Sequence, residues 1–179
     1  MRLNLIILAL FSCLASLSAQ APGTEITLKD GSKFLLGTIG RERLKVEPYS
    51  KWFNSQYNAY EPQRGALSNL ALHFDKVRIL IFLGTWCGDS KREVPRFIKI
   101  TDELDIPDSQ INFISVDRRP GTYKTSPGGE HLKWNIKRVP TFILLRDGRE
   151  IGRIVEHPKI SLEWDLCDLL QCAPDILRK

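Results

Sequence analysis

Cys87 is the residue whose type and position best suit covalent chemistry in this chain. An apolar run at Ile79–Leu83 leads into a Gly-Thr-Trp segment, and Cys87 follows at once. Ser90 with Glu93 three residues later is a capping box, which predicts a helix start. Cys87 is therefore expected at the junction between a buried strand and the N-terminus of a helix. The backbone N–H groups and the helix dipole there favour a thiolate, the nucleophilic form of cysteine.

The chemistry expected of such a thiolate is attack on a disulfide, which forms a mixed disulfide with one half of the substrate. Sites of this kind usually carry a second cysteine three residues later, and Ser90 stands in that position. Release must then come from the substrate's own thiol, from a small thiol such as glutathione, or from another cysteine of the chain. Asp89 beside Cys87 disfavours the anion, whereas Lys91 and Arg92 favour it.

Cys167 and Cys172 lie five residues apart near the end of the chain. In a continuous helix they would point to different faces and sit too far apart for a disulfide. Ala173-Pro174 predicts that the helix ends nearby, so its last turn can unwind and let the two cysteines meet. At this stage a disulfide and two unbridged thiols both remain open.

The elements that position Cys87 follow from the apolar patterns. Apolar or β-branched runs predict strands near 77–83, 111–116, 139–145 and 151–155, and the last two flank the turn pair Asp147-Gly148. Helices are expected from Asp89 or Ser90 onward, with Pro95 inside, and after the N-cap Ser161. This order predicts an α/β protein with a mixed sheet flanked by helices on both faces.

An N-terminal extension, residues 20–64, precedes this pattern. Asp30-Gly31 separates two apolar segments and predicts a hairpin within residues 22–40. Residues 48–60 predict an aromatic helix with a core-facing stripe. The members of that stripe are Tyr49, Trp52, Phe53 and Tyr60.

The chain begins with a segment typical of export. Met1-Arg2, an apolar Leu3–Phe11 run and small residues at 16–19 predict a signal peptide over residues 1–19, too short to span a membrane. The expected location is periplasmic or extracellular, with an uncleaved anchor and lipidation of Cys13 as the alternatives. Removal of Cys13 leaves three of the four cysteines, and an odd count suggests one reactive thiol.

Composition and charge narrow the classes of partner. With 179 residues, 42% of them hydrophobic and 26% charged, the chain suits one globular domain. The net charge is +5, but the basic residues lack the aromatic interleaving of a nucleic-acid surface, so no nucleic-acid partner is expected. No further apolar segment is long enough to cross a membrane. His73, His131 and His157 share no ligand spacing with the cysteines, so no metal site is predicted.

Several of these motifs together resemble the thioredoxin-fold family. They are Trp86-Cys87-Gly88-Asp89-Ser90 after an apolar strand, Pro95, Val139-Pro140-Thr141 and the Asp147-Gly148 hairpin. The resemblance covers roughly residues 65–172 and implies a thioredoxin-like domain over 65–179. It implies that Cys87 is the attacking cysteine and that Trp86, Gly88 and Asp89 shape a substrate groove. It further implies that Pro140 is a cis-proline facing Cys87, with Val139 and Thr141 contributing to substrate binding.

The chain departs from the family pattern at two positions. Ser90 replaces the second cysteine, and Ile81 occupies the place of a buried carboxylate that many members carry. The two departures are consistent, because a site that does not resolve its own mixed disulfide has less need of that base. The resemblance implies monothiol exchange with a disulfide-bearing protein or a small-thiol substrate. No cofactor is expected beyond an external thiol. The alternative is a redox-inactive module that binds extended peptides in the groove at Trp86 and Pro140.

Overall fold

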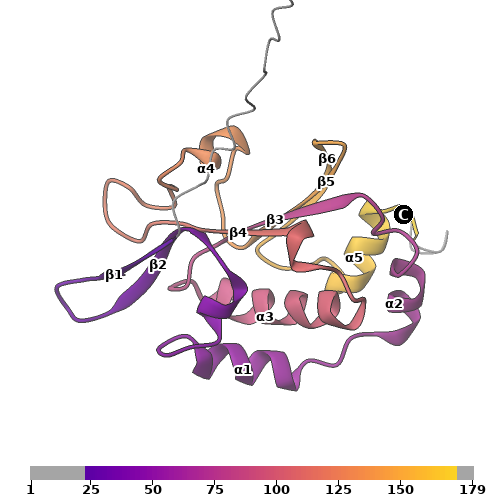
Figure 1. The fold of residues 1–179 in the computed structure, drawn as a ribbon, viewed down its shortest axis with the longest axis horizontal. Coiled ribbons are helices and arrows are strands. Elements are labelled where there is room, and N and C mark those ends of the chain that lie inside the picture. The colour runs from indigo at the N-terminus through magenta and orange to yellow at the C-terminus, as the bar shows by residue number, and fades with distance from the viewer. Residues whose placement is uncertain (1–22, 173–179) are drawn as a thin grey trace, which may run out of the picture.

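The computed structural model describes residues 23–172 and is built around one mixed sheet (Figure 1). The sheet has six strands in the order β1-β2-β4-β3-β5-β6. Only β3 and β4 pair in parallel, and the other neighbours are antiparallel. The strands are β1 (Thr24–Thr27), β2 (Lys33–Ile39), β3 (Val77–Leu83), β4 (Ile111–Ser115), β5 (Thr141–Arg146) and β6 (Arg149–Val155). The helices are α1 (Ser50–Ala59), α2 (Arg64–Leu70), α3 (Gly88–Glu103), α4 (Glu130–Lys133) and α5 (Leu162–Leu169), with 3-10 turns at Arg41–Leu44 and Asp108–Gln110.

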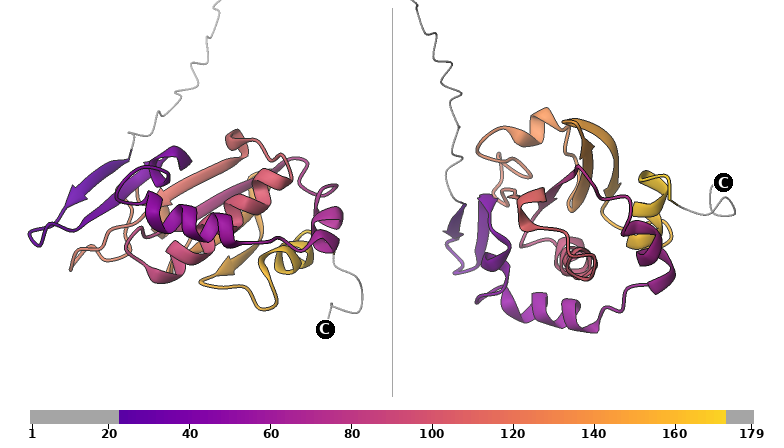
Figure 2. Two further views of the ribbon diagram at one scale, coloured as in Figure 1. Left: turned by 90° about the horizontal axis from the view of Figure 1, so that it is seen from below. Right: turned by 45° about the vertical axis from the view of Figure 1, so that its right-hand side comes forward.

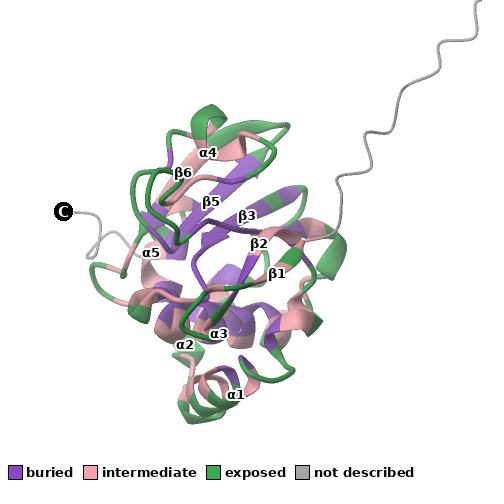
Figure 3. Ribbon diagram, turned by 90° about the vertical axis from the view of Figure 1, so that its left-hand side faces the viewer, coloured by how far each residue is buried: buried purple, intermediate pink, exposed green. Residues whose placement is uncertain are grey.

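The sequence predictions of strands and hairpins are confirmed. The continuous apolar run of β3 lies in the middle of the sheet, where both of its faces are covered. Figure 3 shows β3 and β5 as largely buried strands. The Asp147-Gly148 turn joins β5 to β6, and the N-terminal hairpin of β1 and β2 pairs with β4. The hairpin therefore continues the main sheet.

One face of the sheet is covered by α3, with α1 outside it and with α2 and α5 toward one end (Figure 2). In the right-hand view of Figure 2, α3 is seen almost down its axis between α1 and the strands. Phe97 of α3 stacks on Phe142 of β5 with ring centroids 4.6 Å apart. The predicted aromatic stripe of α1 is confirmed as core packing, since Tyr49 and Phe53 are both 2% exposed.

The opposite face carries a smaller apolar cluster beneath α4 and the segment that leads to β5. Buried residues of β3, β4 and β5 on this face pack against Trp86, Cys87 and Trp134. Helices therefore flank both faces, as predicted. In the described part of the chain, no helix is long and apolar enough to cross a membrane. The predicted signal peptide and Cys13 lie outside the described residues.

Candidate functional site

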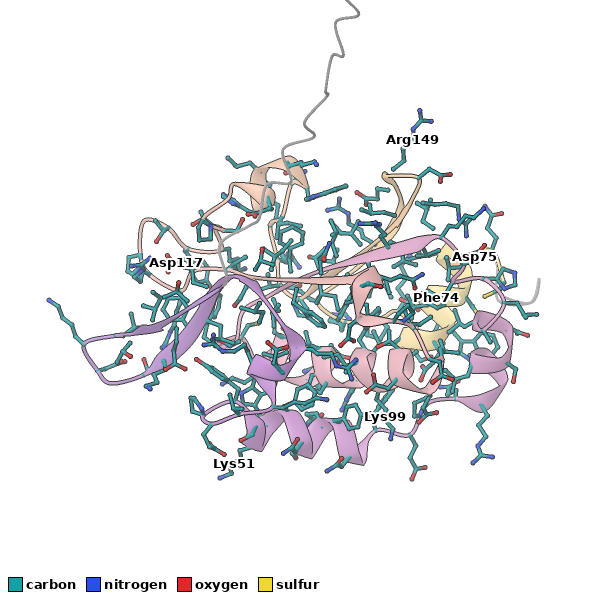
Figure 4. The ribbon with its side chains drawn as sticks, in the orientation of Figure 1. Lys51, Phe74, Asp75, Lys99, Asp117 and Arg149 are labelled. Atoms are coloured by element: carbon teal, nitrogen blue, oxygen red, sulfur yellow. The ribbon has the colours of Figure 1, made fainter. Side chains whose placement is uncertain are left out.

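Cys87 lies at the sheet edge where the two parallel strands end. Because β3 and β4 run in the same direction, their carboxyl ends meet at this edge. Figure 4 labels Asp117, which follows β4, near this end of the sheet, and labels Phe74 and Asp75, which precede β3, at the other. Cys87 is the N-cap of α3, in the extended conformation at φ −83° and ψ 130°. The predicted position at a strand-to-helix junction is confirmed.

The Cys87 thiol faces the loop before β5. Its Sγ donates a hydrogen bond to the carbonyl oxygen of Val139 at 3.2 Å, and the Val139–Pro140 peptide bond is cis. Residues more than fifty positions apart in the sequence thus form one site. Cys87 is partly exposed, whereas Val139 is 1% exposed. Cys87 is therefore partly open to solvent, and the buried Val139 bounds it on one side.

Ser90 does not cap the helix, so the capping-box prediction is wrong. Helix α3 already begins at Gly88, which places Ser90 inside the first turn, where it is fully buried. Its hydroxyl instead accepts a hydrogen bond from the backbone N–H of Gly84 at 3.1 Å. Glu93 is likewise buried and pairs with Arg92 at 2.5 Å rather than reaching back to the helix start. Ser90 thus holds the strand-to-helix turn that carries Cys87.

Trp86 and Tyr123 form an aromatic wall beside the cysteine. The Trp86 indole donates to the Val116 carbonyl at 3.2 Å, and its ring lies 5.0 Å from the ring of Tyr123. Tyr123 is 54% exposed, so this wall faces solvent. No sequence signal pointed to Tyr123, because this residue belongs to a loop of Gly, Pro and basic residues with no periodic pattern.

The loop that carries Tyr123 is held by a buried carboxylate. Asp117 accepts hydrogen bonds from the backbone and side chain of Arg119, the shortest at 2.6 Å, and from the hydroxyl of Thr122 at 3.0 Å. Burial acts to raise the pKa of Asp117, but the bonds from Arg119 and Thr122 prevail and lower it. The backbone N–H of Lys124 donates back to the Asp117 carbonyl at 2.9 Å. Asp117 therefore fixes the fold of the loop.

The remaining predicted site residues differ in their access to the groove. Gly88 is exposed, with open space where a Cβ would stand. Asp89 pairs with Arg92 at 2.9 Å, so a cation compensates the carboxylate beside Cys87. Thr141 is 2% exposed and donates to the Arg138 carbonyl at 2.7 Å. Thr141 therefore supports the backbone around Pro140. Its side chain is buried, so it is not exposed for the predicted contact with substrate.

The other two described cysteines lie at the end of α5, and Figure 1 shows α5 toward the opposite end of the sheet from the start of α3. Their sulfur atoms are 2.7 Å apart and are not joined by a disulfide. Among residues 23–172, no cluster of His, Cys, Asp and Glu side chains suits a metal ion.

Several relatives of the chain are thioredoxins. No family model matches the chain. Thioredoxin H9 of Arabidopsis thaliana is 29% identical over 100 residues, which cover 56% of this chain and 64% of that protein. Mitochondrial Thioredoxin-3 of Saccharomyces cerevisiae is 31% identical over 101 residues, covering 56% of this chain and 71% of the relative. The chain belongs to the thioredoxin family.

A solved structure of the same yeast thioredoxin, in its oxidized form, is 24% identical and covers 56% of this chain and 86% of that one, with a TM-score of 0.33. The match to Thioredoxin H9 spans less than two thirds of that relative's length. Three residues after Cys87 this chain has Ser90, whose hydroxyl accepts the buried hydrogen bond from the Gly84 N–H.

Proposed function

We propose that this protein carries out thiol–disulfide exchange through a monothiol mechanism, with Cys87 as the nucleophile. The observation that carries the proposal is the position of the Cys87 sulfur. It stands partly exposed at the N-terminus of α3, a helix of 16 residues, and faces the Val139 carbonyl. In general, the N-terminus of a helix is a position that suits a nucleophilic cysteine, because unpaired backbone N–H groups point toward it. The similarity to thioredoxins supports the same class of chemistry.

The proposed reaction has two exchange steps. The Cys87 thiolate attacks one sulfur of a substrate disulfide, so a Cys87–substrate disulfide forms, the original S–S bond breaks and the other sulfur leaves as a thiolate. A second thiol then attacks the mixed disulfide and restores Cys87. When that thiol belongs to the substrate, the net reaction is isomerisation. When it is an external thiol such as glutathione, the substrate is reduced and the external thiol ends in a disulfide.

Release by another part of this chain is disfavoured by the arrangement of the described residues. Ser90 occupies the place from which a second thiol would attack, and it has no sulfur. Cys167 and Cys172 lie at the end of α5, and α5 stands toward the opposite end of the sheet from the start of α3 (Figure 1). We therefore assign release to a thiol from outside this chain.

The groove supports an extended disulfide-bearing substrate. Trp86 and Tyr123 bound one side, and the backbone at Val139 and Pro140 bounds the other. The Val139 carbonyl accepts from the Cys87 thiol, so loss of that proton leaves the carbonyl open to an N–H donor of the substrate. Gly88 leaves open space at the mouth.

The test is turnover of a peptide–glutathione mixed disulfide with glutathione as the releasing thiol. The proposal predicts catalysis by the wild-type protein and none by Cys87→Ser. A matched measurement of binding to the reduced peptide distinguishes thiol–disulfide exchange from the alternative role of peptide binding. A wild-type protein that binds the peptide without turnover, with Cys87→Ser binding equally well, would indicate a redox-inactive peptide-binding module.

We further propose that the protein works outside the cytoplasm, on the basis of the leader pattern at residues 1–19. N-terminal sequencing of the protein from its native host tests this. A start near Gln20 supports export with cleavage. A modified start at Cys13 indicates a lipoprotein, and an intact Met1 contradicts cleavage.

A further inference from the structure

The C-terminus of α5 ends in a Schellman motif. The backbone N–H of Cys172 donates to the Cys167 carbonyl at 2.8 Å, and the N–H of Gln171 donates to the Asp168 carbonyl at 3.1 Å. Gln171 has the left-handed conformation, with φ +62°, that this motif requires at the residue after the cap. The chain therefore reverses immediately after α5, so Cys172 returns to the helix turn that contains Cys167.

This motif brings together the side chains at its first and last positions, which are commonly apolar. Here both are cysteines, and their sulfur atoms lie 2.7 Å apart. Cys167 is fully buried in the main apolar core, and its sulfur lies 3.6 Å from the Ala66 carbonyl of α2. Cys172 is only partly buried. Cys167 is thus fixed by packing, and Cys172 is the more exposed residue of the pair.

We propose that Cys167 and Cys172 are a second redox site, which closes to an intramolecular disulfide across the Schellman motif and acts independently of Cys87. The backbone hydrogen bond between Cys172 and Cys167 holds the two residues close together, as a disulfide requires. The contacting sulfurs require no movement of the helix to meet. This site does not rest on the function proposed for Cys87.

The closing reaction needs an oxidant, for which we name a disulfide of a small thiol such as oxidised glutathione. Cys172, the more exposed residue of the pair, attacks it as a thiolate, and one glutathione leaves as a thiolate. Cys167 then attacks the Cys172 sulfur, so the Cys167–Cys172 bond forms and the second glutathione leaves. The cysteine pair loses two electrons and its two protons go to the departing thiolates. Burial raises the pKa of Cys167, which agrees with Cys172 attacking first.

Closure has a defined consequence for the fold. It joins the last turn of α5 to the chain that follows, and Cys167 already packs against α2. The oxidised protein is therefore expected to melt at a higher temperature than the reduced protein, by roughly 4–8 °C for a short loop in a domain of this size. Among the described cysteines, closure also leaves Cys87 as the remaining thiol.

The test is a map of thiols in the full-length protein before and after treatment with oxidised glutathione. The protein is unfolded in acid, alkylated, and cleaved on the N-terminal side of aspartate, which separates Cys167 from Cys172 at Asp168. The proposal predicts a disulfide-linked pair of peptides from the treated protein, lost on reduction. Alkylated Cys167 and Cys172 after treatment, or separate glutathione adducts on each, would overturn it.

Three variants make the result specific to the turn. Cys172→Ser is expected to lose both the linked peptides and the rise in melting temperature. Gln171→Gly keeps the left-handed turn and is expected to close like wild type. Gln171→Pro removes the Gln171 N–H donor and fixes a negative φ, so we expect at least tenfold slower closure. Equal closure rates in the Gly and Pro variants would contradict the role of the motif.

Discussion

One cysteine of this protein lies at the N-terminus of a helix and another lies near the C-terminus of a different helix. The surroundings of the two sulfur atoms differ. Cys87 caps the N-terminus of α3, is partly exposed and faces a backbone carbonyl. Cys167 lies in the last turn of α5, fully buried, in contact with Cys172. The positive end of a helix dipole favours a thiolate, whereas the negative end and burial favour the neutral thiol. Helix polarity and solvent access therefore differ between the partly exposed Cys87 and the pair formed by Cys167 and Cys172.

Removal of the Cys87 thiol should lower activity more than any other substitution. Cys87→Ser should lower the exchange rate with a disulfide peptide to background, on the order of 10³-fold or more, because a hydroxyl cannot form the mixed disulfide. The rate is measured by monitoring peptide release with chromatography. Cys172→Ser is the matched control and should keep wild-type exchange. The reverse result, with activity lost only in Cys172→Ser, would place the reactive thiol on α5.

Ser90→Cys tests whether the site at the start of α3 could work with two thiols if the residue at position 90 were a cysteine. The new sulfur would lie in the first turn of α3, three residues after Cys87, and could attack the mixed disulfide. We expect substrate reduction in the absence of an external thiol, with the product disulfide between positions 87 and 90. A folded variant that still needs an external thiol would count against a competent redox site.

Ser90→Ala measures the structural role of that residue. It should lower the free energy of unfolding by about 1–3 kcal/mol, because the buried N–H of Gly84 loses its acceptor. Urea unfolding at neutral pH gives this value. Ser68→Ala, at an exposed hydroxyl on α2, is the control and should change stability much less. Equal effects at both positions would remove the special role of Ser90.

Alkaline pH should separate the two forms of the α5 dithiol. The pKa of Cys167 is raised by burial above its ordinary value of 9.0, so the folded state holds this proton more tightly than the unfolded state. The resulting stability is fully present below pH 9.0 and is lost as pH rises toward the folded pKa, by up to about 1.4 kcal/mol per pH unit. The oxidised protein has no Cys167 proton to lose. The stability gap between oxidised and reduced protein should therefore widen above pH 9.0, as urea unfolding of each form would show. A constant gap would contradict this.

The sequence predicted the framework of the site better than its details. Apolar runs and the Asp147-Gly148 turn located the central strands, because burial on both faces leaves a clear pattern. Ser161 was correctly predicted as an N-cap, since its hydroxyl accepts from Trp164. The same type of signal failed at Ser90, where the start of α3 is set by the end of β3 and by a tertiary hydrogen bond to Gly84.

Two other features depend on backbone conformations that residue types did not reveal. The contact of Tyr123 with Trp86 follows from the loop that Asp117 holds closed. The meeting of Cys167 and Cys172 depends on a left-handed Gln171, at a position where glycine or asparagine would have been the recognisable signal. Sequence reasoning therefore left both arrangements of the cysteine pair open.

The proposed role of Cys87 as the nucleophile that meets substrate can be tested by trapping. The reduced protein is mixed briefly with a disulfide-bonded peptide, quenched in acid and mapped by mass spectrometry. We expect the first adduct to form to be a mixed disulfide between the peptide and Cys87. Folded protein with Cys87 unmodified, whether or not the α5 cysteines have reacted, would contradict it.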